Sequence, residues 1–133
     1  MTDILSRYNG VSLAYLGDAV IELHIRARLL AFGITDTGRL SMASQKLVCA
    51  GTQSVILDAV LPELTEEEMT AYKRGRNHRA ASKPKHATVA EYSRATGLEA
   101  LFGYLWLLGA EKRIEALFSL AYDAQIEALR GQI

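Results

Sequence analysis

The chain has 133 residues, half of them apolar, with 15 Lys and Arg against 15 Asp and Glu. This length predicts a single domain, residues 1–133, that can bury about two thirds of its unfolded surface, and the composition excludes a disordered chain. No uncharged apolar run reaches the ~18 residues that a membrane helix needs, and the first residues lack the order of a signal peptide. The single Cys49 excludes an internal disulfide framework, and we expect it to fill a small space in the core. Together with the lack of a membrane helix and of a signal peptide, this predicts a cytoplasmic protein with no membrane partner.

Apolar periodicity predicts an all-α fold of six helices, because few stretches alternate with period two. The expected helices span residues 11–31, 37–49, 51–60, 65–75, 88–108 and 110–129. Gly33 is placed to end the first of them, and Asp36 or Thr37 to cap the second. Thr65 with Glu68 three residues later forms a capping box for the fourth.

The expected helix 11–31 carries apolar residues on two nearly opposite sides, a pattern typical of a central helix. One stripe consists of Leu13, Leu16, Val20, Leu23, Ala27 and Leu30, and the other of Val11, Ala14, Ile21, Ile25 and Leu29. At ~100° per residue, Asp18 falls within the second stripe, so we expect its carboxylate to be buried. The neighbouring Gly17 is expected to permit the close approach of another helix, because a mid-helix glycine costs roughly 1 kcal/mol relative to Ala.

A second carboxylate occupies a similar position later in the chain. Glu99 is the only charged residue between Gly97 and Gly109, in a segment that is apolar all round. A buried carboxylate is neutralised by protonation, by a cationic partner or by a metal. Two such acids favour a shared site for Mg²⁺ or Mn²⁺, and the lack of clustered His and Cys argues against zinc. The alternative is structural: Glu99 caps a backbone end, and Asp18 pairs with an internal arginine, namely Arg26, Arg28 or Arg94.

The two motifs resemble those of the ribonuclease III family. Leu13–Val20 reads L-A-Y-L-G-D-A-V, similar to the signature helix of that family, which usually runs L-E-F-L-G-D-[SA]-[VIL]. Glu99–Leu107 resembles the later metal-binding helix, where an E-A-L stretch carries an essential Glu, and the motifs follow in the right order about 80 residues apart. The resemblance implies the helical fold of the family's endonuclease domain, a homodimer, and a catalytic Mg²⁺, with Mn²⁺ as a substitute, held by Asp18 and Glu99.

A chain of this length leaves no residues for a double-stranded-RNA-binding domain, and Lys73–Asn77 reads K-R-G-R-N. Both features are most similar to the bacterial Mini-ribonuclease III group. That resemblance implies metal-dependent cleavage of double-stranded RNA that leaves 5′-phosphate ends. It also implies a substrate, the stem that pairs the two ends of the 23S ribosomal RNA precursor.

Two positions depart from the larger enzymes of the family. Ala14 stands where the signature helix usually has Glu, and Thr96 stands where the later helix usually has Asp. Glu22, one turn after Asp18, could add a water-mediated contact to the metal. The alternative for Glu22 is a solvated ion pair with Arg26 at i+4.

A basic segment separates the two motifs. No Asp or Glu occurs from Met69 to Ala90, and the stretch from about Gly75 to Ala87 has no helical pattern. Lys and Arg contacts to phosphate supply most of the affinity for nucleic acid that does not depend on sequence, and duplex RNA is recognised mainly by its shape and backbone. We therefore expect this segment to bind RNA rather than to be a merely solvated loop, through Lys73, Arg74, Arg76, Asn77, Arg79, Lys83 and Lys85.

Two other classes of function remain open at this point. One is a ribonuclease III-like module that binds RNA without cutting it, for which we would expect loss of Asp18 or Glu99. The other is a helical interaction protein in which the two carboxylates form internal salt bridges. Cleavage of a labelled RNA duplex would separate the three.

Overall fold

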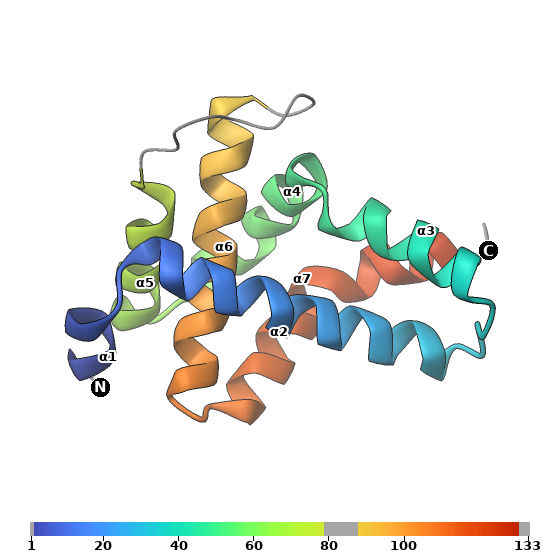
Figure 1. Ribbon diagram of the computed structural model, residues 1–133, viewed down its shortest axis with the longest axis horizontal. Helices are drawn as coiled ribbons and strands as arrows, with labels where there is room; N and C mark the ends of the chain where they lie inside the picture. Colours follow the sequence, from blue (N-terminus) through green and yellow to red (C-terminus); the bar gives the residue numbers. More distant parts are fainter. Residues whose placement is uncertain (1, 79–87, 131–133) are drawn as a thin grey trace.

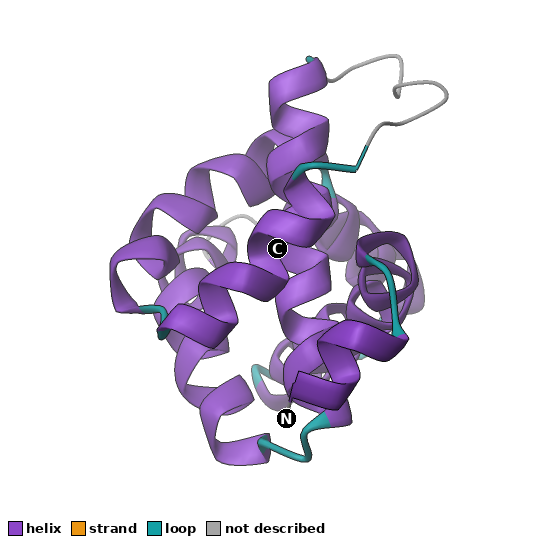
Figure 2. Ribbon diagram, turned by 90° about the vertical axis from the view of Figure 1, so that its left-hand side faces the viewer, coloured by secondary structure: helices purple, strands orange, loops and turns teal. Residues whose placement is uncertain are grey.

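The computed structural model describes residues 2–78 and 88–130, and their regular structure is entirely helical (Figure 2). The elements are α1 (Thr2–Arg7), α2 (Gly10–Ala31), α3 (Thr37–Val48), α4 (Ala50–Val60), the 3-10 turn η1 (Leu61–Glu63), α5 (Glu66–Arg76), α6 (Val89–Leu107) and α7 (Glu111–Arg130). The all-α prediction is confirmed, and every boundary of the six expected helices lies within one residue of its expected position. The sequence analysis did not predict α1 or η1.

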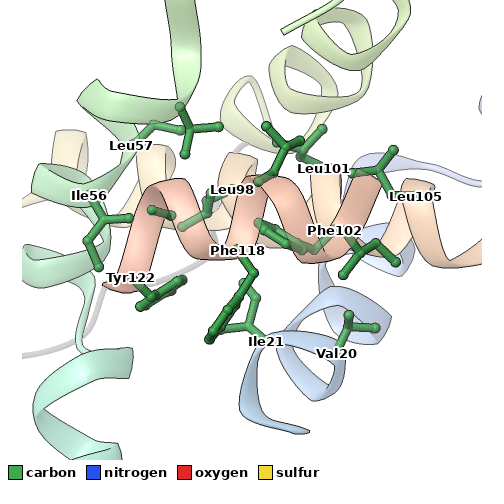
Figure 3. Packing of buried hydrophobic residues seen from close by; sticks show 14 of the residues in the cluster. Val20, Ile21, Ile56, Leu57, Leu98, Leu101, Phe102, Leu105, Phe118 and Tyr122 are labelled. Atoms are coloured by element: carbon green, nitrogen blue, oxygen red, sulfur yellow. The ribbon is translucent and has the colours of Figure 1, made fainter. Parts of the chain in front are cut away.

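Helix α6 forms the centre of the molecule. It runs across α2, with α5 along one side and α3, α4 and α7 on the other (Figure 1). The close-up of the core shows side chains of α2, α4, α6 and α7 meeting around it, among them Ile21, Ile56, Leu98, Phe102 and Phe118 (Figure 3). Nearly every residue of α6 from Ala95 to Leu105 is buried, so the expected apolar segment is enclosed as far as Leu105, whereas Trp106 and Leu107 are exposed.

The helix termini follow the expected chemistry. The Asp36 side chain accepts a hydrogen bond from the Arg39 amide at 2.9 Å, and Gly33 has a φ of 88°, the left-handed conformation that ends α2. The capping box of Thr65 and Glu68 is present at the start of α5. A second capping box, of Thr88 with Glu91, starts α6 and was not anticipated from the sequence. It fixes the first turn of the helix that carries Glu99.

Two burial predictions were wrong. Asp18 is exposed rather than enclosed in an apolar stripe, and Val11 on the same expected stripe is 41% exposed. The buried face of α2 runs through Leu13 and Gly17, because α6 packs there, and glycine contributes nothing to an apolar periodicity. Cys49 is also exposed, since it lies between α3 and α4 with an extended backbone and not within a helix.

No helix in the described part of the chain is both long enough and apolar enough to span a bilayer.

Candidate active site

The site is built where α2 and α6 touch backbone to backbone. A Cβ atom added to Gly17 would lie 1.6 Å from the carbonyl oxygen of Glu99, and one added to Gly103 would lie 1.9 Å from that of Leu13. No side chain could occupy either position without driving the helices apart. The prediction that Gly17 permits a close helix approach is therefore confirmed, and the contact brings Asp18 next to Glu99.

A second glycine contact joins α6 to α5. A Cβ on Gly97 would meet the Tyr72 ring at 2.5 Å, and a Cβ on Gly75 would meet the Cβ of Ala100 at 2.6 Å. The last turn of α5, where the basic segment begins, is thus held against the turn of α6 that carries Glu99. The acidic site and the start of the basic segment share one region of the surface.

Asp18 and Glu99 form a pair of neighbouring carboxyl groups. The pKa of Glu99 is raised from 4.5 to about 8, first by burial and then by the hydrogen bond and the negative charge of the adjacent Asp18. Glu99 is only partly buried and Asp18 is exposed, so the pair is reached from solvent. Two carboxylates that repel each other at an accessible surface fit a divalent cation, which would neutralise both.

The raised pKa of Glu99 makes the stability of the metal-free protein depend on pH. Between about pH 4.5 and pH 8 the folded chain holds a proton on Glu99 that the unfolded chain has lost, so stability falls as pH rises through this range. We expect thermal unfolding in the presence of a chelator to show a Tm that declines over this range. Replacing Glu99 by Gln should flatten the decline and raise Tm at pH 8 and above. Parallel Tm profiles for the two proteins would contradict the assigned carboxyl pair.

The salt-bridge alternative fails, because each candidate arginine is engaged elsewhere. Arg26 pairs with Glu22 at 3.3 Å, which confirms the i+4 ion pair. In the described part of the chain neither Asp18 nor Glu99 takes part in a salt bridge, since the remaining two arginines bind other acids: Arg28 contacts Glu115 and Asp123, and Arg94 contacts Asp58.

The donor set around the pair is small. Residues 2–78 and 88–130 contain no group of three or more His, Cys, Asp and Glu side chains placed to hold a metal. The Ala14 side chain has no atom that could bind a metal. The Thr96 hydroxyl donates a hydrogen bond to the Tyr92 carbonyl oxygen at 2.9 Å. Mg²⁺ keeps several of its waters and is commonly bound through one or two carboxylates, so a pair such as Asp18 and Glu99 would suffice as its protein ligands.

Two further polar side chains, Gln53 of α4 and Tyr122 of α7, are buried close to these carboxylates. The sequence analysis missed them. An available signal was that Gln53 shares a helical face with Ile56, Leu57 and Val60, where an apolar residue would be expected.

The basic segment is only partly described. Lys73 is exposed, whereas Arg74 donates to the backbone carbonyl of Leu5, which ties α5 to α1. Arg76 lies over the Tyr72 ring at 5.6 Å, and its Nε donates to the Asn77 side chain at 3.0 Å. The other three residues expected to bind RNA, Arg79, Lys83 and Lys85, lie outside the described residues.

Asp18 lies on open surface, and Glu99 beside it is partly buried. A cavity of about 500 Å³ opens between α2 and α3, and it meets the site only at Glu22. An exposed Asp18 suits a substrate too large to enter a pocket, as an RNA duplex is. The exposure that contradicted the burial prediction is thus compatible with the predicted chemistry.

Comparison with known proteins identifies the family. A ribonuclease III domain model matches residues 11–110, a range that contains both carboxylates. The chain belongs to the Mini-ribonuclease III family. It is 42% identical over 113 residues to the Mini-ribonuclease 3 of Symbiobacterium thermophilum, covering 85% of this chain and 87% of that protein. It is 40% identical over 114 residues to that of Brevibacillus brevis, covering 86% and 85%.

A solved structure supports the same assignment. A protein from Fusobacterium nucleatum, 36% identical, superposes with a TM-score of 0.80 over 92% of this chain and 98% of its own. The resemblance expected from Leu13–Val20 and Glu99–Leu107 is therefore confirmed, as is the ribonuclease III domain fold. Membership in this family makes the chain an endoribonuclease, and it implies binding of double-stranded RNA and use of a divalent metal ion.

Proposed function

We propose that this protein is a Mg²⁺-dependent endonuclease that cuts double-stranded RNA as a homodimer and matures the 23S ribosomal RNA precursor. The observation that carries the proposal is the pair of carboxyl groups, Asp18 and Glu99, joined by the glycine contact between α2 and α6. Both residues are retained, which argues against the alternative of a module that binds RNA without cleaving it.

In this proposal Asp18 and Glu99 hold Mg²⁺, and Mn²⁺ can substitute for it. When bound, the ion stabilises the charge that develops on the phosphoryl oxygens and lowers the pKa of water. Asp18 presents its carboxylate from an exposed turn, so the scissile phosphate can approach without a change in fold. Glu99 comes from the buried middle of α6, which limits its movement. Hydrolysis would leave a 5′-phosphate and a 3′-hydroxyl.

A cleavage assay tests this function and its alternative together. The substrate is an RNA hairpin that reproduces the paired ends of a 23S precursor, labelled on each strand, and the control is the same RNA without base pairing. We expect cuts in both strands of the duplex with Mg²⁺ or Mn²⁺ and none with a chelator. Binding without cleavage at saturating metal would favour the non-catalytic module.

The basic segment is proposed as the surface that grips RNA. The segment begins in the last turn of α5, which packs against α6 beside the acidic site. Lys73 in this turn is exposed, so it can contact phosphate. Asn77 and five further cations complete the proposed set. The cations are Arg74, Arg76, Arg79, Lys83 and Lys85. Because Arg74 also holds α1, we omit it from the test.

Replacing Arg76, Arg79, Lys83 and Lys85 together by Ala should weaken duplex binding and raise KM more than it lowers kcat, because the metal ligands lie elsewhere. If all four contact phosphate, the slope of log affinity against log salt should flatten by roughly three to four units. Fluorescence anisotropy at several salt concentrations measures the slope. The control replaces Arg39 and Lys112, exposed cations of α3 and α7, by Ala. An unchanged slope in the fourfold variant would assign RNA binding to another surface.

A homodimer is proposed because apolar side chains remain uncovered beside the site. Tyr15 is 84% exposed, one turn from Asp18 on the same helix, and Val11 precedes it by a further turn at 41% exposed. A symmetric interface over this face would cover both side chains and bring two sites together, one for each strand of a duplex.

We expect sedimentation at low micromolar concentration to show a mass of about twice 14.6 kDa. Tyr15→Glu should convert the protein to a monomer, because a charge buried in an interface is costly. Met42→Lys, at a side chain of α3 that is 63% exposed, is the matched control and should leave the dimer intact. A wild-type monomer that still makes paired cuts would refute the dimeric mechanism.

A further inference from the structure

Two buried polar groups lack hydrogen-bond partners in the described part of the chain. They are the side-chain amide nitrogen of Gln53, a residue 2% exposed, and the hydroxyl of Tyr122, a residue with no exposed surface. Leaving a buried donor unpaired costs about 1–3 kcal/mol, and native proteins contain few such groups. Leu and Phe would fill the same space without that cost, so the polar atoms call for a functional explanation.

Tyr122 lies near enough to the acidic site to feel its charges, and Gln53 is adjacent to Tyr122. The Tyr122 ring stacks on Phe118 with 4.8 Å between ring centroids, and it lies at the end of the apolar cluster (Figure 3). Burial raises the pKa of its hydroxyl, and the adjacent Gln53 side chain lowers it in part, although the two groups complete no hydrogen bond. The negative charges of Glu99, Asp18 and Glu22 raise this pKa further. The hydroxyl therefore keeps its proton and is a hydrogen-bond donor beside the carboxylates.

The kind of group matters as much as its place. The described donor set holds two neighbouring carboxylates, and a third acid would add repulsion when no cation is bound. An amide and a phenol orient a carboxylate through hydrogen bonds without adding charge. Carboxylates that bind metals are themselves commonly held by such outer hydrogen bonds, and their loss typically costs 10–100-fold in metal affinity or activity.

We propose that Gln53 and Tyr122 are positioning residues, whose N–H and O–H groups donate hydrogen bonds into the ligand shell of the divalent ion and orient Glu99 within it. The proposal rests on the proposed function, because it assigns these residues to the same metal site. It explains why α4 and α7, which carry none of the proposed ligands, place unpaired polar atoms in the core near Glu99.

The test measures metal affinity in the absence of RNA. Electron paramagnetic resonance reports free Mn²⁺ as the ion is titrated into the full chain. We expect Tyr122→Phe and Gln53→Leu each to weaken Mn²⁺ binding by about 10-fold. The Tm of the metal-free variants should be unchanged or higher, because each substitution removes an unpaired buried donor. The matched control is Tyr104→Phe, a tyrosine 1% exposed whose hydroxyl donates to Glu67 at 3.2 Å, and it should bind Mn²⁺ as the wild type does.

The outcomes separate this inference from the function on which it rests. If the wild type binds Mn²⁺ and cleaves RNA while both variants bind Mn²⁺ equally well, the positioning role is overturned and the proposed function stands. If the wild type binds no Mn²⁺, both are overturned. Should Gln53→Leu fail to fold, Tyr122→Phe decides the question alone, because it removes a single oxygen atom.

Discussion

Asp18→Asn and Glu99→Gln are each expected to lower the rate of RNA cleavage at saturating Mg²⁺ by roughly 10³-fold or more, while duplex binding and dimerisation survive. Each amide keeps the volume of the carboxyl group but loses the charge that would bind the metal, and metal-assisted charge stabilisation is worth several kcal/mol in the transition state. Single-turnover kinetics with excess enzyme measure the rate, and anisotropy measures the binding.

Because the two carboxylates would act on one ion, the double variant should be little slower than either single variant. Glu22→Gln is the control. The Glu22 carboxylate is paired with Arg26, so this substitution should lower the cleavage rate by less than about tenfold, which corresponds to about 1.4 kcal/mol of activation free energy. Cleavage by Asp18→Asn or Glu99→Gln within tenfold of the wild type would remove these residues from the metal site.

Gly17→Ala should cost the fold about 3 kcal/mol or more, since the added methyl group would lie 1.6 Å from the Glu99 carbonyl oxygen and α2 must move away from α6. A loss of this size lowers Tm by roughly 10 °C in a domain of this length. At a temperature where the variant is still folded, its rate of RNA cleavage should be about 100-fold below that of the wild type, because the two carboxylates would separate.

Gly51→Ala provides the comparison. It also changes a helical glycine, but the nearest atom to its added Cβ is Glu91 Oε2 at 3.5 Å, an ordinary contact. Helix propensity then favours Ala by up to about 1 kcal/mol, so Tm should hold or rise. If Gly17→Ala unfolded at the wild-type temperature, the contact between the two helix backbones could not be as close as described.

Most of the fold could be predicted from local patterns. Periodicity located the six long helices, and the Thr65 capping box and the left-handed Gly33 fixed helix ends, because these signals depend on neighbours a few residues away. α1 spans six residues, too few for a periodic pattern to stand out. Cys49 was misplaced because a periodic stretch continues across the sharp junction of α3 and α4.

The site was harder to predict. That Asp18 and Glu99 act together was expected from the two acids and from the resemblance of their motifs, and it stays a prediction, although the two carboxyl groups do lie side by side. The exposure of Asp18 could not be predicted, because a helical wheel does not say which turns of a stripe the core covers: Ile25 and Leu29 of the same stripe are buried, whereas Asp18 is not. Gln53 and Tyr122 were missed because their proximity depends on how α4 and α7 pack against α6, which no local pattern encodes.

The spacing of Asp18 and Glu99 depends on main-chain atoms touching main-chain atoms at Gly17 and Gly103. Such a contact has no rotamers to adjust and no side-chain volume to vary. Apolar residues elsewhere in the core, such as Leu57 or Ile114, can therefore be exchanged for others of similar volume at a cost that is usually below about 1.5 kcal/mol, without altering the distance between the two carboxylates. The protein offers a scaffold whose stability can be engineered separately from its chemistry, provided that the two glycines at the crossing are left untouched.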